Sequence, residues 1–368
     1  MKFFLLSLIF FFSLKCTAHA EIQTKISEEL EALSKKYYLS FSGKDGKING
    51  NKKHVGYQRL EYSLVNAANG KEEDKRFFKQ RLKSGWGKPD YEKDLAYLAD
   101  NLLLYSYAYS IWHKEDYGKT ATNIYNYLRN FIATSEAVFD TAAKAKTISS
   151  LAVFYSATLN KPALEDAQNY IKTIIKDRSP TEGGFKLFED SLYMSKAFLD
   201  LYMVTADKKW LERSESAATY TIKNFSGSLA SARIFNLLYH YTGKNLYREQ
   251  AESMLKKFRK VQEKSEEKLT QLLMTITELN SEPLHITIVG HKDDPSALEL
   301  FQSGLKYFSQ YKRLEWWDKR EGPMPNPDVT YPEMQKAAAF ICTNKRCSLP
   351  IFEPKKIPEI IQILTKSN

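Results

Sequence analysis

Carboxylate side chains close to aromatic residues are the part of this sequence that could do chemistry. Glu92 lies near Trp86, and Glu182, Glu189 and Asp190 form a second group further along the chain. Glycoside cleavage needs two carboxylates, one as the acid and the other as the base or nucleophile, and aromatic rings stack on sugar faces. The four acidic residues are therefore the candidate catalytic residues of a carbohydrate-active enzyme.

The same segments also fit a protein that binds without catalysis. Acidic residues at the start of a predicted helix, such as Glu189 and Asp190, stabilise the helix N-terminus. Glu92 and its neighbour Lys93 are then an ordinary solvent-exposed pair. The side chains expected to contact a ligand are Trp86, Asp90, Lys93, Tyr193 and Arg233.

Several other chemistries lack their residues. The sequence contains neither Gly-x-Ser-x-Gly nor His-Glu-x-x-His, and it has no glycine-rich loop of the kind that holds a phosphate. Serine hydrolases of the nucleophile-elbow type, zinc proteases and nucleotide hydrolases are thus excluded. We expect no metal and no cofactor. The formal charge of +10 comes from Lys and Arg spread along helix faces, so we also expect no nucleic-acid partner.

The N-terminal segment has the order of a secretory signal. Lys2 precedes the apolar residues 3–14, and Ala18-His19-Ala20 supplies the small residues of a cleavage site before Glu21. The apolar run is too short to cross roughly 30 Å of hydrocarbon as a helix. Residues 1–20 are therefore expected to be a signal peptide, and the mature protein to be periplasmic or secreted, without stable membrane insertion. A carbohydrate or an envelope protein is the expected partner.

An oxidising compartment gives the cysteines a structural role. Cleavage removes Cys16, and Cys342 and Cys347 remain with four residues between them. Such a segment can turn back on itself and close a disulfide. A catalytic redox pair typically has two intervening residues, and a zinc site would need two further ligands nearby. We therefore predict a Cys342–Cys347 disulfide that closes a loop.

Helical periodicity extends from Glu21 to about Asn280. Helices that are apolar nearly all round, such as residues 91–112 and 187–205, alternate with helices that carry one apolar stripe, such as residues 117–131. The striped helices share a repeat, in which an aromatic or small residue is followed four positions later by a small one. Its copies begin at Tyr117, Ala163, Trp210 and Tyr247, and a period of roughly forty residues suits a helical hairpin. The pattern predicts a ring or arc of hairpins with the apolar helices inside.

The character of the sequence changes after Pro283. Residues 284–290 form a short β-branched strand, and Asp294-Pro295 begins a helix that runs to Tyr311. Residues 314–317 and 337–342 are two further strands, and residues 357–364 form a closing helix. The predicted fold is therefore mainly α, with residues 21–280 as an (α/α) toroid of helical hairpins and residues 281–368 as a small α/β element.

Several motifs resemble those of the thioredoxin-domain-containing proteins related to the spermatogenesis-associated thioredoxin-like protein. The family's P-H-F-E-K and Y-D-N segments are similar to Pro89-Asp90-Tyr91-Glu92-Lys93 and Asp100-Asn101, and its S-P-E-G-G-F to residues 179–185. Residues 189–193 resemble its L-E-D-Y-A helix start. Residues 286–295 resemble its V-V-I-V-G-x-x-D-D-P, and Phe340-Ile341-Cys342 with Cys347 and Pro350 resembles its Y-V-C and C-x-x-P.

The resemblance covers the chain from about Trp86 to its end. It implies a toroid of the kind found in sugar epimerases and six-hairpin glycosidases. The family's thioredoxin domain has no counterpart here, and neither has its acidic stretch after G-G-F, so the implied toroid is incomplete. Whether a separate thioredoxin replaces the missing domain as a partner stays open. These departures favour a non-catalytic glycan- or protein-binding scaffold over a glycoside hydrolase.

In toroids of this kind, chemistry takes place at the mouth where loops enter the inner helices. The resemblance therefore places the candidate residues of segments 86–93, 182–193 and 226–233 at one mouth. Sugar epimerases of this architecture use histidine for proton transfer. His113 and His240 fall near the opposite ends of inner helices, and His285 and His291 lie in the α/β element, so epimerisation is disfavoured.

Overall fold

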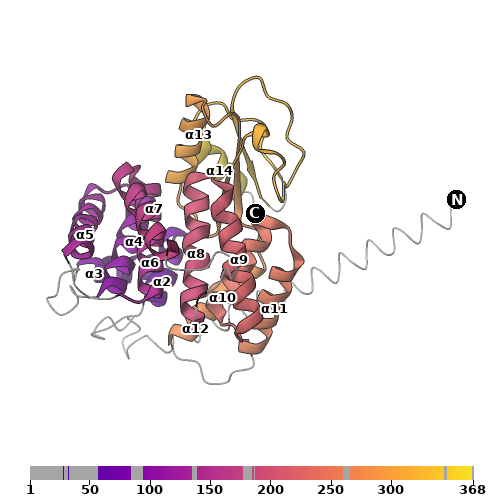
Figure 1. Ribbon diagram of the computed structural model, residues 1–368. Helices are drawn as coiled ribbons and strands as arrows, with labels where there is room; N and C mark the ends of the chain where they lie inside the picture. The colour runs from indigo at the N-terminus through magenta and orange to yellow at the C-terminus, as the bar shows by residue number, and fades with distance from the viewer. Residues whose placement is uncertain are drawn as a thin grey trace.

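The computed structural model shows a mainly α-helical protein with a small C-terminal sheet, as the sequence predicts (Figure 1). It describes residues 57–83, 94–134, 139–176, 185, 187–259, 266–343 and 346–366, together with the helical residues Glu28 and Ala32. The predicted signal peptide lies outside these residues. Within them, no helix combines the length and the apolar character that spanning a membrane requires.

The helices alternate between an inner and an outer layer. The inner helices are α2 (Tyr57–Ala68), α4 (Leu95–Trp112), α6 (Thr141–Thr158), α8 (Phe188–Thr205), α10 (Leu229–Thr242) and α12 (Glu266–Leu279). The outer helices are α3 (Glu72–Lys83), α5 (Glu115–Thr134), α7 (Lys161–Lys176), α9 (Lys208–Asn224) and α11 (Asn245–Arg259). Each inner helix contacts the next, and α12 also contacts α2. The sequence predicted an incomplete ring. Among the described helices, however, the inner helices form a continuous ring. The last of them, α12, is followed by a strand.

Small residues bring the outer helices close to the inner ones, as the repeat predicts. Ala121, Ala167, Ser214 and Ala251 occupy equivalent positions in four outer helices, and all are fully buried. Ser214 Oγ donates to Ser195 O of α8 at 2.7 Å, and Ser195 Oγ donates to Ser214 O at 2.9 Å. The two helices therefore touch through their backbones, and a larger side chain at these positions would force them apart.

The turn from inner to outer helix is the same in four hairpins. Helices α4, α6, α8 and α10 each end at a residue in the left-handed region, whose N–H donates to the carbonyl of a tyrosine four positions earlier. These residues are His113 (φ 50°), Leu159 (φ 57°), Ala206 (φ 53°) and Gly243 (φ 69°). The conformation costs a residue with a Cβ roughly 1–2 kcal/mol. Only the glycine of the fourth turn adopts it without strain.

The C-terminal element is a three-stranded sheet in the order β2-β1-β3. β1 (Leu284–Val289) pairs in parallel with β2 (Lys312–Trp317) and antiparallel with β3 (Ala338–Cys342). Helix α13 (Pro295–Lys306) connects β1 to β2, the short helix η1 (Lys319–Glu321) follows β2, and α14 (Lys356–Lys366) follows β3. The sequence predicted that α13 would reach Tyr311, which is wrong. The helix ends at Lys306, because Lys312 Nζ takes the carbonyls of its last turn.

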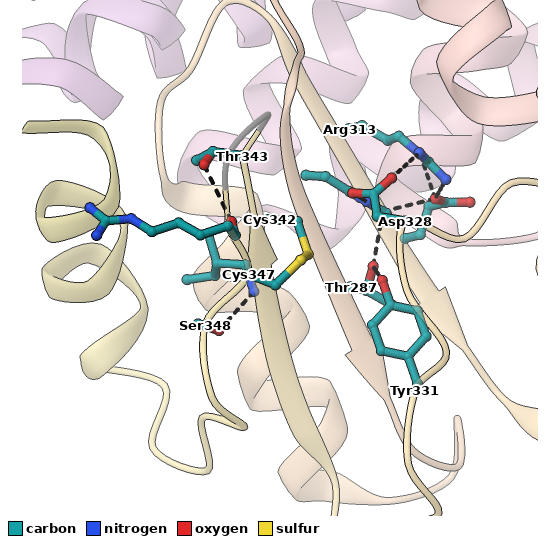
Figure 2. The surroundings of a disulfide bond; sticks show 12 residues. Thr287, Arg313, Asp328, Tyr331, Cys342, Thr343, Cys347 and Ser348 are labelled. Carbon is teal, nitrogen blue, oxygen red and sulfur yellow. Dashed lines mark hydrogen bonds and ion pairs between the residues drawn. A yellow bond between two sulfur atoms is a disulfide. The ribbon is translucent and has the colours of Figure 1, made fainter. Parts of the chain in front are cut away.

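Cys342 and Cys347 form the predicted disulfide (Figure 2). The bond closes a tight turn in which Thr343 N donates to Arg346 O at 2.9 Å, and Ser348 N donates to Ile341 O at 2.8 Å. Cys342 is the last residue of β3 and is buried. The disulfide therefore anchors the chain that follows β3 to the sheet.

The α/β element lies against one end of the ring, the end at which the inner helices finish (Figure 1). Lys292 Nζ donates to Ala206 O at the end of α8, and Asn326 Nδ2 donates to His240 O in the last turn of α10, both at 2.7 Å. Carbonyls at a helix C-terminus have no partner within the helix. The α/β element satisfies these carbonyls and covers that end of the ring.

Candidate functional site

A cavity of about 220 Å³ lies between the inner helices, at the centre of the ring. Its walls carry side chains three or four positions apart, a spacing that places them on one face of each helix. They are Asp100, Leu103, Tyr107 and Ser110 of α4, Lys146, Ser149, Val153 and Ser156 of α6, and Tyr193, Lys196, Asp200 and Met203 of α8. The wall also includes Tyr57 and Glu61 of α2, Arg233 of α10, and Gln271 and Glu278 of α12. Charged and polar side chains therefore face the cavity among apolar ones, which include Ala230, Ile234 and Leu237 of α10.

Arg233 joins three helices at the cavity wall. Its Nε and Nη2 each donate to Glu278 of α12 at 2.8 Å, and its Nη1 and Nη2 donate to Glu61 of α2 at 3.3 and 3.1 Å. Burial raises the pKa of Glu278, although Arg233 beside it favours the charged form. The sequence predicted Arg233 as a ligand contact. The structure places it at the cavity, with its guanidinium directed to the chain's own carboxylates.

Asp200 is a further carboxylate that faces a cation in the cavity. Lys196, one helical turn earlier, donates from Nζ to Asp200 Oδ1 at 2.5 Å. The Asp200 side chain is 6% exposed, and its other oxygen, Oδ2, has no hydrogen-bond partner among the described residues. A buried polar atom without a partner costs about 1–3 kcal/mol of stability.

Asp100 and Lys146 form a looser pair on the opposite part of the wall. Lys146 Nζ lies 4.0 Å from Asp100 Oδ2 and 5.2 Å from the centre of the Tyr193 ring. Burial raises the pKa of Asp100 to about 6, against the opposing effect of Lys146. Asp100 can therefore hold or release a proton close to neutral pH.

The connection between α13 and β2 forms the floor of the cavity. We call residues 307–311 the floor loop. Gln310 Nε2 donates to Glu61 Oε1 at 2.9 Å, and the Phe308 ring packs edge-on against Tyr107, with 5.2 Å between the ring centres. The wall of the cavity thus comes from the ring, and its floor comes from the α/β element.

Lys312 holds the floor loop in place. Its Nζ donates to the carbonyls of Gly304, Leu305 and Tyr307 at 3.1, 3.0 and 2.7 Å. Burial lowers the pKa of Lys312 to about 7. The three N–H bonds of its ammonium group are all used within the α13–β2 connection.

The structure separates the site residues that the sequence predicted. Tyr193 and Arg233 both line the cavity. Glu189 is exposed and Asp190 is buried in the first turn of α8, and neither lines the cavity. The predictions for Trp86, Asp90, Glu92, Lys93 and Glu182 lie outside the described residues.

Sequence reasoning missed the charged residues of the inner helices. Asp100, Lys146, Lys196, Asp200 and Glu278 all line the cavity. Asp100 is the only charged residue of α4, whereas the others lie in helices that carry two to four charged residues. A single charge in an enclosed helix has to find partners inside the protein, because burying it alone is costly. That signal was present in the sequence, and it points to the ring's centre rather than to a mouth.

A second polar cluster lies in the α/β element. His285 Nδ1 is 2.6 Å from Asp328 Oδ2, and His285 Nε2 is 2.9 Å from Thr287 Oγ1, which is the order of an acid, a base and a hydroxyl nucleophile. Thr287 is only 1% exposed, and the Tyr331 hydroxyl donates to it at 2.8 Å (Figure 2). No substrate can reach this hydroxyl. The cluster attaches the segment with Asp328 and Tyr331 to the sheet.

Comparison with known proteins gives little further information. No family model matches this chain, and no curated protein matches it. Among solved structures, the Lin0763 protein from Listeria innocua is similar, with a TM-score of 0.48 and 14% sequence identity. The similarity covers 62% of this chain and 85% of that protein.

Proposed function

We propose that the chain is an exported binding protein of the cell envelope, whose ligand is a small polyhydroxylated molecule, such as a glycan fragment, held in the central cavity. The observation that carries this proposal is the convergence of polar side chains from the inner helices on one cavity. Hydroxyl groups donate and accept hydrogen bonds, so a polyol can join a network of carboxylates, amines and tyrosines from several sides.

The pairing of charges in the cavity disfavours an anionic ligand. Glu61 and Glu278 neutralise Arg233, and Asp200 is bonded to Lys196. A carboxylate or phosphate ligand at Arg233 or Lys196 would have to displace these internal acceptors and would meet their repulsion, and Lys146, 4.0 Å from Asp100, is the cavity cation that is paired more loosely. A neutral or weakly cationic polyol has no such cost.

Export has independent support from the chemistry of the chain. Residues 1–20 have the order of a secretory signal. The Cys342–Cys347 disulfide fits an oxidising compartment such as the periplasm or the exterior. We also propose that the chain is related to the thioredoxin-domain-containing family whose motifs it resembles, and that its ring corresponds to the toroid of six-hairpin glycosidases and sugar epimerases.

A thermal-shift screen of the purified protein against oligosaccharides and cell-wall fragments tests the proposed function. A bound sugar should raise the melting temperature with the logarithm of its concentration. Ser149→Phe places a ring in the cavity, and Ser216→Phe places the same ring on the exposed face of α9. The shift should persist in Ser216→Phe and vanish in Ser149→Phe, once circular dichroism confirms that both variants are folded. A shift retained by Ser149→Phe would place the ligand elsewhere.

A glycoside hydrolase is the second candidate function. The observation that favours it is Asp100, whose raised pKa of about 6 suits a proton donor, and which has Glu61 among the carboxylates near enough to influence it. Product analysis of any stabilising oligosaccharide separates the two candidates. Hydrolysis that disappears in Asp100→Asn, with binding retained, supports the enzyme, and intact oligosaccharide after long incubation supports the binding protein.

A further inference from the structure

A second hollow lies where helices α4, α5 and α6 meet the end of α13. We call it the side groove, and its volume is about 480 Å³, against about 220 Å³ for the central cavity. Its lining includes Tyr109 of α4, Lys119 and Asn123 of α5, and Lys306 of α13. Ser110 of α4 lines both spaces, but no charged residue of the central cavity lines the side groove. The side groove can therefore hold a ligand of its own.

Two lysines of the side groove have unused donors. Lys119 and Lys306 form no hydrogen bond and no ion pair with any residue that the structure describes. Lys306 is the last residue of α13, where a lysine can bind the terminal carbonyls of its own helix. Lys312 already binds carbonyls of that last turn. Both ammonium groups of the side groove can therefore take an acceptor from a ligand.

One carboxylate of the side groove opposes an anion. Glu115 lies one helical turn before Lys119 in α5 and also lines the groove. It forms an ion pair neither with Lys119 nor with Lys306. Among the described lining residues the positive charges thus outnumber the negative ones, and the side groove favours an anionic ligand.

Tyr109 supplies an aromatic surface beside these charges. A Cβ at Gly118 would lie 3.1 Å from two carbons of the Tyr109 ring, so the absence of a side chain there lets the ring pack closely against α5. The His113 ring meets the Tyr109 ring edge-on, with 6.5 Å between the ring centres. Tyr109 remains partly exposed, and Asn123 is exposed. An aromatic ring packs on the apolar face of a sugar, and an amide both donates to and accepts from its hydroxyls.

We propose that the side groove is a second ligand site, which binds an acidic oligosaccharide whose sugar rings carry carboxylates. Lys119 and Lys306 each donate to a carboxylate of a different sugar, because the ligand extends along the groove, and Tyr109 packs against a ring between or beside them. Hydrogen bonds between an ammonium group and a carboxylate are stronger than those between neutral groups. An acidic peptide would satisfy the lysines but would leave the aromatic ring without a sugar face. This site goes beyond the function proposed above, since its residues and the charge of its ligand are different.

Isothermal titration calorimetry of the full chain with two matched probes tests the second site. Tetragalacturonate carries a carboxylate on every sugar ring, and its fully methyl-esterified form keeps the rings without the charge. We expect tetragalacturonate to bind about tenfold more tightly than the ester, and its affinity to fall as salt is added. Lys119→Gln and Lys306→Gln should each weaken the binding of tetragalacturonate about threefold, and Glu115→Gln should strengthen it.

Lys256→Gln is the matched control. It removes the same charge from an exposed lysine of α11 that lines neither the side groove nor the central cavity, and it should leave the affinity unchanged. Equal weakening in all three lysine variants would show attraction to the overall positive charge of the protein and would overturn the site. Tetraglutamate that binds as tightly as tetragalacturonate would overturn the saccharide ligand. Failure of tetragalacturonate to bind at millimolar concentration would overturn the proposal as a whole.

Ser149→Phe separates this inference from the proposed function. The variant fills the central cavity and should leave the binding of tetragalacturonate intact. Loss of that binding in Ser149→Phe would place the acidic sugar in the central cavity and overturn the second site. A neutral oligosaccharide that binds the wild type but not Ser149→Phe would retain the proposed function, whatever the lysine variants do.

Discussion

Arg233 Nη2 lies 3.1 Å from Glu61 Oε1, although 172 positions separate the two residues. Glu61 belongs to α2 and also accepts from Gln310 of the floor loop at 2.9 Å. Through this one carboxylate, an early helix of the ring, a late helix of the ring and the α/β element meet at the cavity. The stability of the ring and the shape of the site therefore depend on the same contacts.

Replacing Arg233 should destabilise the protein strongly. Arg233→Met leaves Glu61 and Glu278 buried without their cation, a change that typically costs about 3–5 kcal/mol. Urea unfolding followed by circular dichroism measures the loss. Arg129→Met is the matched control, because Arg129 pairs with Asp166 on the surface and is 58% exposed, so its loss should stay within about 1 kcal/mol. Equal losses in both variants would contradict a buried role for Arg233.

Asp100 should make the protein less stable as the pH rises through its titration. Its pKa is about 6 in the folded protein and 3.8 in the reference state, so the folded chain binds a proton that the unfolded chain has already released. The free energy of unfolding contributed by Asp100 therefore falls between about pH 4 and pH 6 and stays lower above that range. Asp100→Asn removes this dependence and should be more stable than the wild type at neutral pH, by about 1–3 kcal/mol.

Asp293 is the control for Asp100, and its contribution to stability should depend on pH in the opposite direction. A hydrogen bond from Arg320 lowers the pKa of Asp293, so its contribution to stability is present at neutral pH and is lost as the pH falls. Chemical denaturation of the two Asp→Asn variants from about pH 2 to pH 8 should give curves that deviate from the wild type in opposite directions, with the Asp293 effect lost only below about pH 4. Parallel curves for Asp100→Asn and the wild type would show that Asp100 titrates normally.

A glycine at the end of α4 should stabilise the protein. His113 is exposed and holds a φ of 50°, a conformation that a glycine adopts without a Cβ clash. We expect His113→Gly to raise the free energy of unfolding by about 0.5–1 kcal/mol after the added flexibility of the unfolded chain is deducted. Gly243 occupies the equivalent position at the end of α10, and Gly243→Ala should lower the free energy of unfolding. The φ of Gly243 is 69°, and Asn326 lies 3.2 Å from the position of the new Cβ. Thermal unfolding of both variants measures the two changes in stability.

The disulfide should contribute modestly to stability. It joins residues separated by five positions, and for so short a loop the restriction of the unfolded chain is worth about 2 kcal/mol. The double variant Cys342→Ala/Cys347→Ala should lose about this amount. Adding a reductant should lower the melting temperature of the wild type to that of the double variant and leave the variant unchanged. A wild type that does not respond to reductant would show that the bond does not form.

The sequence predicted the parts of the fold that follow from periodicity. The repeat that begins at Tyr117 depends on small residues such as Ala121. Each of these residues is buried where an outer helix contacts an inner one, because only a small side chain permits the two helices to approach so closely. The strand and helix order after Pro283 is also predicted correctly. The end of α13 is not predicted correctly. Lys312 donates to the carbonyls of the last turn of α13, and this contact cannot be read from the local sequence pattern.

The candidate site was predicted only in part, for a physical reason. Tyr193 and Arg233 line the cavity, but the acidic residues considered at the start of α8 do not. The interpretation treated the inner helices as apolar and therefore looked for polar chemistry at their ends. Asp100 and Asp200 show the weakness of this reasoning, since an enclosed ring can keep charges at its centre when they compensate one another.

The position of the α/β element against the helix ends has a consequence for how the protein acquires its site. Residues that close the bottom of the pocket leave the ribosome more than two hundred positions after Glu61, to which one of them binds. A polypeptide that stopped after α12 would be a tube with two openings, and the terminal carbonyls of its helices would face water. Such a tube would lack the floor of the cavity, so the pocket exists only once the connection between α13 and β2 has been synthesised.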